Sequence, residues 1–179
     1  MFTLPAKKDI IRFSLVAAVI IFFDALTKTV MLELIFNPPR VITILPFLNF
    51  APAWNEGVSF GLLAQGGNWT RYGISLLALV VVLWLFFQLP QLYKGQKIAA
   101  GLISGGAIGN VIDRQIYGKV VDFIDFHLGA WHYPAFNIAD SAIFIGVGIW
   151  MGSLVVEVRR QKQQDGNQQD TNQNKGDGT

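Results

Sequence analysis

The chain has 179 residues, of which 52% are hydrophobic and only 15% are charged, with a formal net charge of +2 and a mean hydropathy of +0.41. This composition excludes an ordinary soluble domain and indicates an integral membrane protein. The sequence contains no cysteine, which excludes disulfides, thiolate nucleophiles and cysteine metal sites. Its length suits one compact bundle with modest loops, and we predict a single domain over residues 1–160.

Four apolar stretches are each close to the roughly 20 residues that a helix needs to cross a hydrocarbon core ~30 Å thick. The predicted spans are residues 10–34, 72–89, 98–116 and 138–158. In the third, Gly101, Gly105 and Gly109 recur at four-residue spacing, which allows a helix to approach its neighbours closely. The alternative for this stretch is a flexible glycine-rich loop. We predict an all-α membrane protein built as a four-transmembrane-helix bundle.

The first predicted span could be mistaken for a cleavable signal peptide, because Lys7 and Lys8 precede it. No small-residue cleavage site follows, and the stretch continues through Asp24 and Lys28, so we expect a span that is retained. The next segment, residues 35–70, is too long for a tight connection. It contains short β-branched and aromatic runs broken by prolines, which predicts a small extramembrane β-rich segment between the first two helices.

Basic residues predict the orientation of the bundle. One side of the predicted membrane carries only Arg40, Arg71 and Lys119. The other side carries Lys7, Lys8, Arg12, Lys94, Lys97, Arg159, Arg160, Lys162 and Lys175. The more basic side faces the cytoplasm, so both termini are expected there. Residues 161–179 are rich in Gln, Asn, Gly and Asp without apolar periodicity, which predicts a disordered cytoplasmic tail.

The polar side chains of the predicted bundle collect at one depth. From a helical rise of about 1.5 Å per residue, the residues expected near the outer membrane surface are Asp24, Lys28, Asn110, Asp113, Arg114, Asp122 and Asp140. Charges at the edge of a bilayer core are costly, and a shared depth indicates a shared site. Asp122, in the short loop before the last span, and Asp140 can share a proton, so that one acts as a base and the other as an acid.

Plainer roles are compatible with the same residues. Asp24 and Lys28 are four residues apart, where an ion pair can simply neutralise both charges. Arg114 can bind a carboxylate or a backbone carbonyl, or extend towards the lipid headgroups. Asp140 precedes Ser141 and an apolar run, a pattern typical of a helix N-cap, which would favour its ionised form.

Two other chemistries are weaker candidates. Residues 57–61 satisfy the G-x-S-x-G pattern of serine hydrolases, with His127 or His132 as a conceivable base. The pattern is short, and loop residues follow it where a nucleophile elbow needs a helix. The histidines also suggest metal ligands, but neither an H-E-x-x-H helix nor an obvious third ligand accompanies them. We expect both histidines to be polar residues of an outer loop.

Five short segments contain most of the polar residues, in the order Asp24-Ala-Leu-Thr-Lys28, Asn55-Glu-Gly57-Val-Ser-Phe60, Gly109-Asn110-Val-Ile-Asp113-Arg114, Gly118-Lys-Val-Val-Asp122-Phe123 and Phe136-Asn137-Ile-Ala139-Asp140. Together they resemble the successive motifs of the bacterial lipoprotein signal peptidases, also called signal peptidase II, over roughly residues 8–158. The resemblance implies an aspartic endopeptidase of the bacterial cytoplasmic (inner) membrane. It would remove signal peptides from diacylglyceryl-modified prolipoproteins by cleaving before the lipidated cysteine.

The resemblance also assigns positions. Asp122 and Asp140 match the family's catalytic dyad, although spacing alone would not separate Asp122 from Asp125. The positions that match residues lining or supporting the family's site are Asp24, Lys28, Asn55, Gly57, Asn110, Arg114, Asn137 and Ala139. The run Ala51–Trp54 departs from the family's usual extended run, so the local path there stays open. Ser59 stands where the family often has alanine, which weakens the serine alternative.

A carboxyl dyad predicts a mechanism without a metal or an organic cofactor. The ionised aspartate takes a proton from a water molecule, while its protonated partner polarises the scissile carbonyl. The signal helix must unwind locally, and Asn55, Asn110, Asn137 and Arg114 are candidates for holding the exposed backbone. The expected partners are prolipoprotein signal peptides and membrane lipid, with no nucleic acid, and we expect a monomer.

The main alternative function is a small membrane transporter or assembly protein whose intramembrane charges form an ion pathway. Such a pathway needs polar residues along the depth of the bundle. The second and fourth predicted spans are nearly bare of them. A polar site confined to one face therefore favours the peptidase.

Overall fold

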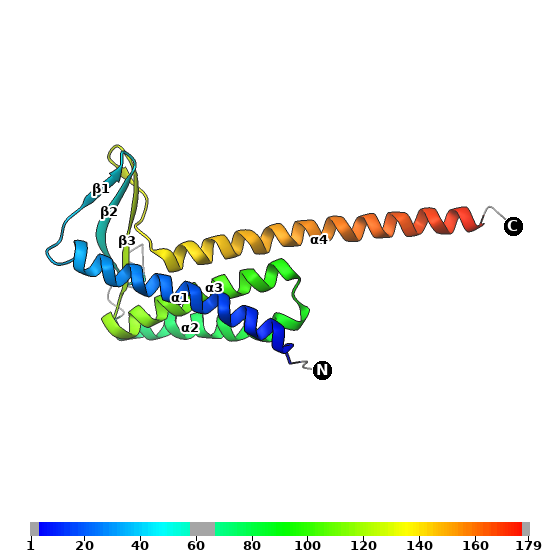
Figure 1. Ribbon diagram of the computed structural model, residues 1–179, viewed down its shortest axis with the longest axis horizontal. Coiled ribbons are helices and arrows are strands. Elements are labelled where there is room, and N and C mark those ends of the chain that lie inside the picture. Colours follow the sequence, from blue (N-terminus) through cyan, green and yellow to red (C-terminus); the bar gives the residue numbers. More distant parts are fainter. Residues whose placement is uncertain (1–3, 58–66, 177–179) are drawn as a thin grey trace.

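A computed structural model describes residues 4–57 and 67–176 of the chain. The helices in these residues are α1 (Lys7–Ile35), α2 (Gly67–Gln88), α3 (Lys94–Tyr117) and α4 (Ile138–Gly176), with a short 3-10 turn, η1 (Leu89–Gln91), after α2. The strands are β1 (Ile42–Leu45), β2 (Leu48–Asn55), β3 (Val120–Leu128) and β4 (Trp131–His132). Figure 1 shows the strands at one end of the helices, whereas the start of α1 and the end of α4 lie at the other end.

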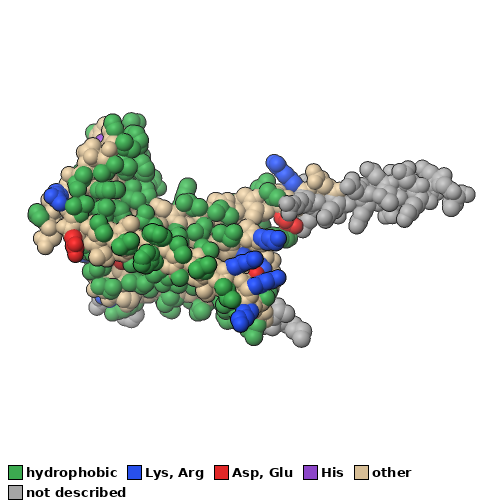
Figure 2. Space-filling view, in the orientation of Figure 1, with side chains coloured by type: hydrophobic (Ala, Val, Ile, Leu, Met, Phe, Trp, Pro, Cys, Tyr) green, Lys and Arg blue, Asp and Glu red, His purple; other side chains and the backbone are tan. Residues whose placement is uncertain are grey.

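Three of the described helices are long and apolar enough to cross a membrane, over Lys7–Ile35, Arg71–Gln91 and Ile138–Arg159. They coincide with the first, second and fourth predicted spans. Large apolar side chains stay exposed along them, as with Leu76 at 64% and Phe144 at 82%, and Figure 2 shows hydrophobic side chains spread over the helical surface. Helices that face hydrocarbon show this pattern because their outer side chains need no shelter from water.

The third apolar stretch is the helix α3, so the alternative of a flexible glycine-rich loop is wrong. Its glycines allow close packing on both sides. A Cβ atom at Gly105 would lie 2.8 Å from the carbonyl oxygen of Ala17 in α1, and one at Gly106 would overlap the carbonyl oxygen of Ala139 in α4. Side chains at these positions would push the helices apart, because backbones this close leave no room for a methyl group. The close approach predicted for the glycine spacing is confirmed, and α3 lies between α1 and α4.

The strands form an antiparallel sheet in the order β1-β2-β3-β4. Ala53 of β2 pairs with Asp122 of β3, and Asn49 pairs with Asp125. The register between β2 and β3 shifts between Phe50 and Ala53, the part of the chain whose path the sequence leaves open. Pro52 lies within this shift, as expected because proline has no N–H to donate to a strand partner.

This sheet corrects several expectations. In its described residues, the predicted β-rich segment 35–70 supplies β1 and β2, whereas β3 and β4 follow α3. Asp122 therefore lies in a strand and not in a loop, and His127 and His132 are paired residues of β3 and β4. The protein is therefore not all-α, because two separate segments, one before α2 and one after α3, together form a sheet. The first four residues of β3 are all buried, so buried and exposed positions do not alternate there. The two-residue period by which a strand is recognised in a sequence is therefore missing.

Two apolar clusters hold the elements together. Phe13 of α1 packs with Leu85, Leu89 and Ala100 between the helices. Met31, Ile35 and Phe123 form a second cluster where the end of α1 meets β3. Lys and Arg side chains gather at the end of the helices away from the sheet (Figure 2). The sheet is thus fixed to one end of the bundle by apolar contacts, and a cluster of Lys and Arg side chains lies at the opposite end.

The end of α4 differs from the sequence expectation. The helix continues from its apolar part to Gly176, through the segment after residue 160 for which composition predicts disorder. The segment contains no proline, and its glutamines favour helix about as well as lysine does. Nothing in it therefore stops a helix that is already formed by the apolar residues before it.

Candidate active site

Asp122 lies in β3 and is almost fully buried, with 1% of its surface exposed. Its carboxylate accepts a hydrogen bond from Asn55 Nδ2 at 2.9 Å and another from Asn137 Nδ2 at 2.7 Å. Burial raises the pKa of Asp122 to about 6, aided by the nearby charge of Asp140 and opposed by the two amide hydrogen bonds. Asp122 is therefore a carboxyl group that can hold a proton near neutral pH.

Asp140 lies in the first turn of α4 and is half-buried. The sequence suggests that it caps this helix, but the cap is Asn137. Asn137 Oδ1 accepts the backbone N–H of Asp140 at 2.9 Å, and Asp140 Oδ2 accepts the backbone N–H of Asn137 at 3.3 Å. This reciprocal pair is a capping box, which leaves Asp140 Oδ1 to accept from Asn110 Nδ2 at 2.7 Å. The positive end of the helix dipole favours negative charge at this position.

Asn137 joins the two aspartates. Its side chain is completely buried, and its Nδ2 atom lies 2.7 Å from Asp122 Oδ1 while its Oδ1 atom binds the backbone of Asp140. The same Nδ2 is 3.1 Å from Asn110 Oδ1 and 3.3 Å from the carbonyl oxygen of Val121. The start of α4 and the middle of β3 are thus held side by side by one amide group.

The buried side chain of Lys28 contacts residues that surround Asp122 and Asp140. Lys28 Nζ is 2.7 Å from Asp24 Oδ2, 2.8 Å from Asp113 Oδ2 and 3.2 Å from Asn110 Oδ1, with 3% of the lysine side chain exposed. The predicted pair of Asp24 and Lys28 is therefore present, but the ammonium group also serves two residues of α3. Asp24 Oδ1 in turn accepts the backbone N–H of Ala139 at 2.9 Å, which ties α1 to the start of α4.

The sequence places Asp113 at the common depth of the polar residues but assigns it no role in the site. Its Oδ2 atom accepts the backbone N–H of Val121 at 3.0 Å, directly before Asp122 in the chain. The residue is 5% exposed, so this bond is made away from water. Asp113 belongs to the same motif as Asn110 and Arg114, but motif spacing does not reveal a partner in another element. The contact shows that α3 positions β3 through this carboxylate.

Gly57 and Arg114 lie together beside the aspartates. Asn55 Oδ1 accepts the backbone N–H of Gly57 at 2.8 Å, and Gly57 has a φ of +93°, a conformation that side chains disfavour. A Cβ atom there would lie 3.8 Å from Arg114 Nη2. Arg114 donates to the backbone carbonyl of Asn110 at 3.3 Å, and its charge interacts with those of Asp140 and Asp122. All the site residues predicted from the sequence therefore gather in one region.

Asp125 belongs to a different cluster. It is three residues from Asp122 along β3, and an odd separation in a strand turns two side chains to opposite faces. Its carboxylate accepts from Asn49 Nδ2 at 3.1 Å and lies 2.8 Å from Nδ1 of His132. Burial raises the pKa of Asp125, but the contacts with His132 and Asn49 outweigh it, so the pKa lies below its usual value. No bond in the described chain joins Asp125 to Asp140.

The two weaker chemistries concern Ser59 and the histidines. Ser59 lies outside the described residues. Across residues 4–57 and 67–176, no group of three or more histidine, aspartate or glutamate side chains is placed to hold a metal ion. The stacked rings of His127 and His132, 5.2 Å apart, are accounted for by the pairing of their strands and by Asp125.

The charges around Asp122 and Asp140 favour one shared proton in the site. Four carboxyl groups, those of Asp24, Asp113, Asp122 and Asp140, face the two cations of Lys28 and Arg114. A buried excess of negative charge favours keeping one proton in the cluster. Since Lys28 is already paired with Asp24 and Asp113, the proton is best placed between Asp122 and Asp140. A carboxylate and a carboxylic acid that are held near one another can act together as a base and an acid.

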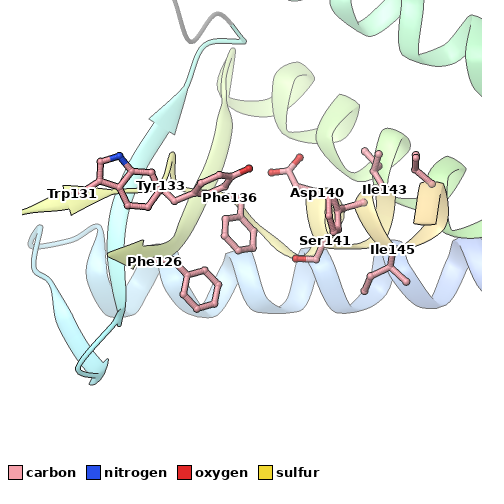
Figure 3. A pocket seen from close by; sticks show the side chains of 10 residues that line it. Phe126, Trp131, Tyr133, Phe136, Asp140, Ser141, Ile143 and Ile145 are labelled. Carbon is pink, nitrogen blue, oxygen red and sulfur yellow. The ribbon is translucent and has the colours of Figure 1, made fainter. Parts of the chain in front are cut away.

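An apolar pocket of about 800 Å³ opens beside Asp140. Figure 3 shows Asp140 and Ser141 between the aromatic side chains of Phe126, Tyr133 and Phe136 on one side and the isoleucines of α4 on the other. Pockets of this size accept a small molecule or part of a larger one. The candidate site thus combines an acid–base pair with an adjoining apolar cavity.

These features define a class: a membrane protein with several apolar helices that brings two aspartates, one of them buried, together at one end of the bundle. A family model described as signal peptidase (SPase) II matches residues 16–156. The chain belongs to the signal peptidase II family. It is accordingly an aspartic peptidase and a multi-pass protein of the inner membrane.

Individual relatives agree with this assignment. The lipoprotein signal peptidase of Paraburkholderia phymatum is 43% identical over 158 residues, which cover 87% of this chain and 94% of the relative. That of Burkholderia thailandensis is 43% identical over 134 residues, covering 73% and 80%. Two solved structures, each described as a bacterial membrane enzyme, superpose with TM-scores of 0.69 and 0.67 at 27% and 28% identity. They cover 88% and 86% of this chain, and 94% and 97% of their own chains.

Proposed function

We propose that this protein removes signal peptides from diacylglyceryl-modified prolipoproteins by cleaving before the lipidated cysteine, with Asp122 and Asp140 as the catalytic pair. The observation that carries the proposal is the bridge made by Asn137, which holds both carboxyl groups in one hydrogen-bonded unit. The family relationship supports the substrate class, since the relatives are named lipoprotein signal peptidases. Asp125 has partners of its own in the sheet, which favours Asp122 for catalysis.

In the proposed reaction Asp122 carries the proton and Asp140 is ionised. The raised pKa of Asp122 and the position of Asp140 at the positive end of α4 support this order. Asp140 takes a proton from a water molecule, whose oxygen adds to the scissile carbonyl carbon, while Asp122 donates its proton towards the carbonyl oxygen. The tetrahedral intermediate then collapses. Asp122 recovers its proton, and Asp140 gives the water proton to the leaving amine of the lipidated cysteine.

The hydrogen bonds divide the supporting residues into two groups. The side-chain amides of Asn110 and Asn137 are engaged by the aspartates and by Lys28, so we assign them to holding the pair and not to the substrate. Arg114 and Gly57 lie at the edge of the same site. A guanidinium group suits the extended chain of an unwound signal peptide, whose exposed carbonyls need donors. Gly57, whose N–H is already donated to Asn55 Oδ1, leaves space beside Arg114 because it has no side chain.

We further propose that α3 is a fourth membrane span and that the site lies near the outer face. α3 runs between α1 and α4, with glycine contacts to both, although it is less apolar than they are. Lys and Arg side chains gather at the end away from the sheet, which supports a cytoplasmic location for that end and for both termini. The enzyme would act as a monomer on substrates that arrive through the membrane lipid.

Cleavage by the purified full-length chain tests the proposal. The substrate is a diacylglyceryl prolipoprotein in lipid vesicles, with the unlipidated precursor as a comparison. We expect Asp122→Asn and Asp140→Asn to abolish cleavage while keeping the unfolding temperature of the wild type. Asp125→Asn and Ser59→Ala are matched controls that should keep most activity. Full activity in either dyad variant, or loss of activity in Ser59→Ala, would refute the assignment.

A further inference from the structure

The side-chain amide of Asn55 is oriented by Gly57. Asn55 Nδ2 donates to Asp122 Oδ2 at 2.9 Å, while Asn55 Oδ1 accepts the backbone N–H of Gly57 at 2.8 Å. An amide has one donor end and one acceptor end, so the N–H of Gly57 decides which end faces the carboxyl group. The hydrogen bond to Asp122 therefore depends on whatever keeps Gly57 in place.

Gly57 packs against the first turns of α2. A Cβ atom at Gly57 would lie 2.6 Å from Cδ1 of Ile74, so the end of this isoleucine occupies the space into which a side chain would extend. Ile74 belongs to α2, whereas Gly57 follows β2. The turn that orients Asn55 is thus supported by a methyl group from another element, and its position depends on where α2 lies.

Polar contacts join the start of α2 to the end of α3. Arg71 Nη2 donates to the carbonyl oxygen of Gln115 at 2.7 Å, and Gln115 Nε2 donates to Ser75 Oγ at 3.2 Å. Arg71, Ile74 and Ser75 have i, i+3 and i+4 spacing, which puts them on one face of α2. The residues that hold α2 therefore flank the isoleucine that packs on Gly57.

These contacts carry weight because the rest of α2 is apolar. The helix lies alongside α3 (Figure 1), and Ser75 is only 4% exposed within a run of apolar residues. Apolar side chains that exchange lipid for another apolar helix give little preference for one depth or rotation of the helix. Hydrogen bonds join particular donors to particular acceptors. The contacts of Arg71 and Ser75 with Gln115 therefore fix both the depth and the rotation of α2.

We propose that the contacts of Arg71, Ser75 and Gln115, here called the α2–α3 clamp, position an active-site carboxyl group. The clamp keeps α2 against the turn after β2, and this turn keeps the amide of Asn55 directed at Asp122. No hydrogen bond in the described chain joins a clamp residue to the carboxyl pair, so these are positioning residues. The inference rests on the proposed function, which gives Asp122 its role in cleavage.

The clamp should affect the pH dependence of cleavage. Burial raises the pKa of Asp122 to about 6, and the hydrogen bond from Asn55 is the largest effect that opposes burial. This bond stabilises the ionised carboxylate, so its loss would raise the pKa further. Because Asp122 acts in its protonated form, the alkaline fall of kcat/KM should then move to higher pH.

Arg71→Met removes one contact of the clamp and keeps a long side chain. With the diacylglyceryl prolipoprotein as substrate, we expect the alkaline fall to move upwards by about half a pH unit or more. Arg71→Lys can still donate to the carbonyl oxygen and should keep most of the wild-type profile. Arg40→Met is the matched control, because Arg40 Nε donates to the carbonyl oxygen of Leu34 at 2.6 Å, near the end of α1. It should leave the profile unchanged.

Ile74→Ala tests the same path without a change of charge. It removes the methyl group that packs on Gly57 and should also move the alkaline fall upwards. Leu77→Ala is its matched control, since Leu77 is one turn further along α2 and is 65% exposed. This control should have the wild-type profile.

The four variants decide the inference together. If neither Arg71→Met nor Ile74→Ala moves the alkaline fall, or if their controls move it equally, the clamp is wrong while the proposed function stands. A shift in Arg71→Met alone would be an effect of charge, and a shift in Ile74→Ala alone would be packing without the clamp, so either would overturn the inference. If the wild type does not cleave the substrate, the proposed function fails. Isotope-edited infrared titration of Asp122, which needs no turnover, then tests the clamp by the same shift.

Discussion

Replacing Lys28 by methionine keeps the shape of a buried side chain and removes its charge. The ammonium group contacts Asp24 at 2.7 Å and Asp113 at 2.8 Å, and its side chain is only 3% exposed. Loss of one partner from a buried ion pair costs about 3–5 kcal/mol, because it leaves an uncompensated charge away from water. At roughly 2–4 °C per kcal/mol for a chain of this size, the melting temperature should fall by on the order of 10 °C. Thermal unfolding of the purified protein in detergent measures this change.

The same variant should change the pH dependence of cleavage. The charge of Lys28 lowers the pKa of Asp122, which burial raises to about 6. Without that charge Asp122 holds its proton more tightly, so the pair stays singly protonated to a higher pH. The alkaline fall of kcat/KM should therefore move upwards in Lys28→Met, as measured by a pH–rate profile with the lipidated substrate.

Two further variants test whether Lys28 and the carboxyl groups are electrostatically coupled. Lys97→Met removes a lysine whose partner is Asp9, at the opposite end of the bundle, and should leave the pH profile unchanged. The double variant Asp24→Asn with Lys28→Met removes one of the stranded carboxylates and should recover part of the lost stability, since the amide oxygen of the introduced asparagine can still accept the N–H of Ala139. If Lys28→Met altered neither the melting temperature nor the pH profile, the carboxyl groups would not form an electrostatic unit.

The remaining predictions concern the proton, β3 and the contact between α3 and α4. Because burial raises the pKa of Asp122 to about 6, kcat/KM should fall about tenfold per pH unit above that value, and a flat profile would contradict the assigned proton. Asp113→Ala leaves the buried N–H of Val121 unpaired, which costs about 1–3 kcal/mol, and also removes one of the two carboxylates paired with Lys28, so the loss of stability should exceed that range; kcat should fall about tenfold to a hundredfold and recover partly in Asp113→Asn. Gly106→Ala should destabilise the protein by about 1–3 kcal/mol in thermal unfolding, whereas Gly148→Ala, which meets nothing within 4 Å, should not.

Much of the fold follows from simple patterns in the sequence. Apolar length predicts the three helices that are long and apolar enough to span a membrane, and the spacing of Gly101, Gly105 and Gly109 predicts the close approach of α3 to α1. Both signals are local, since they depend on residues within a single helix. β3 gives no such signal. Its buried first residues hide the alternation of a strand, and its partner β2 lies more than sixty residues earlier in the chain.

The candidate site shows the same division. The residue types and their common depth predict that the polar side chains gather, and the structure brings Asp122, Asp140 and Lys28 together. The sequence does not show which of these side chains are hydrogen-bonded to one another. Asn137 takes the capping role expected of Asp140, because an N-cap depends on where the helix begins and the two candidates are only three residues apart. The contact of Asp113 with Val121 depends on sheet placement, which motif spacing does not contain.

The position of Asn137 and Ala139 has a consequence for how the enzyme is made. Both lie at the start of α4, which follows the other described elements along the chain, and they donate to Asp122 and Asp24 respectively. A nascent chain that has inserted α1, α2 and α3 still lacks these donors, and it lacks Asp140 as well. If Asp122 and Asp140 are the catalytic pair, as proposed, the newly made protein gains its hydrolytic capacity in a single step, when α4 docks, and chains that lack α4 cannot cleave a peptide bond.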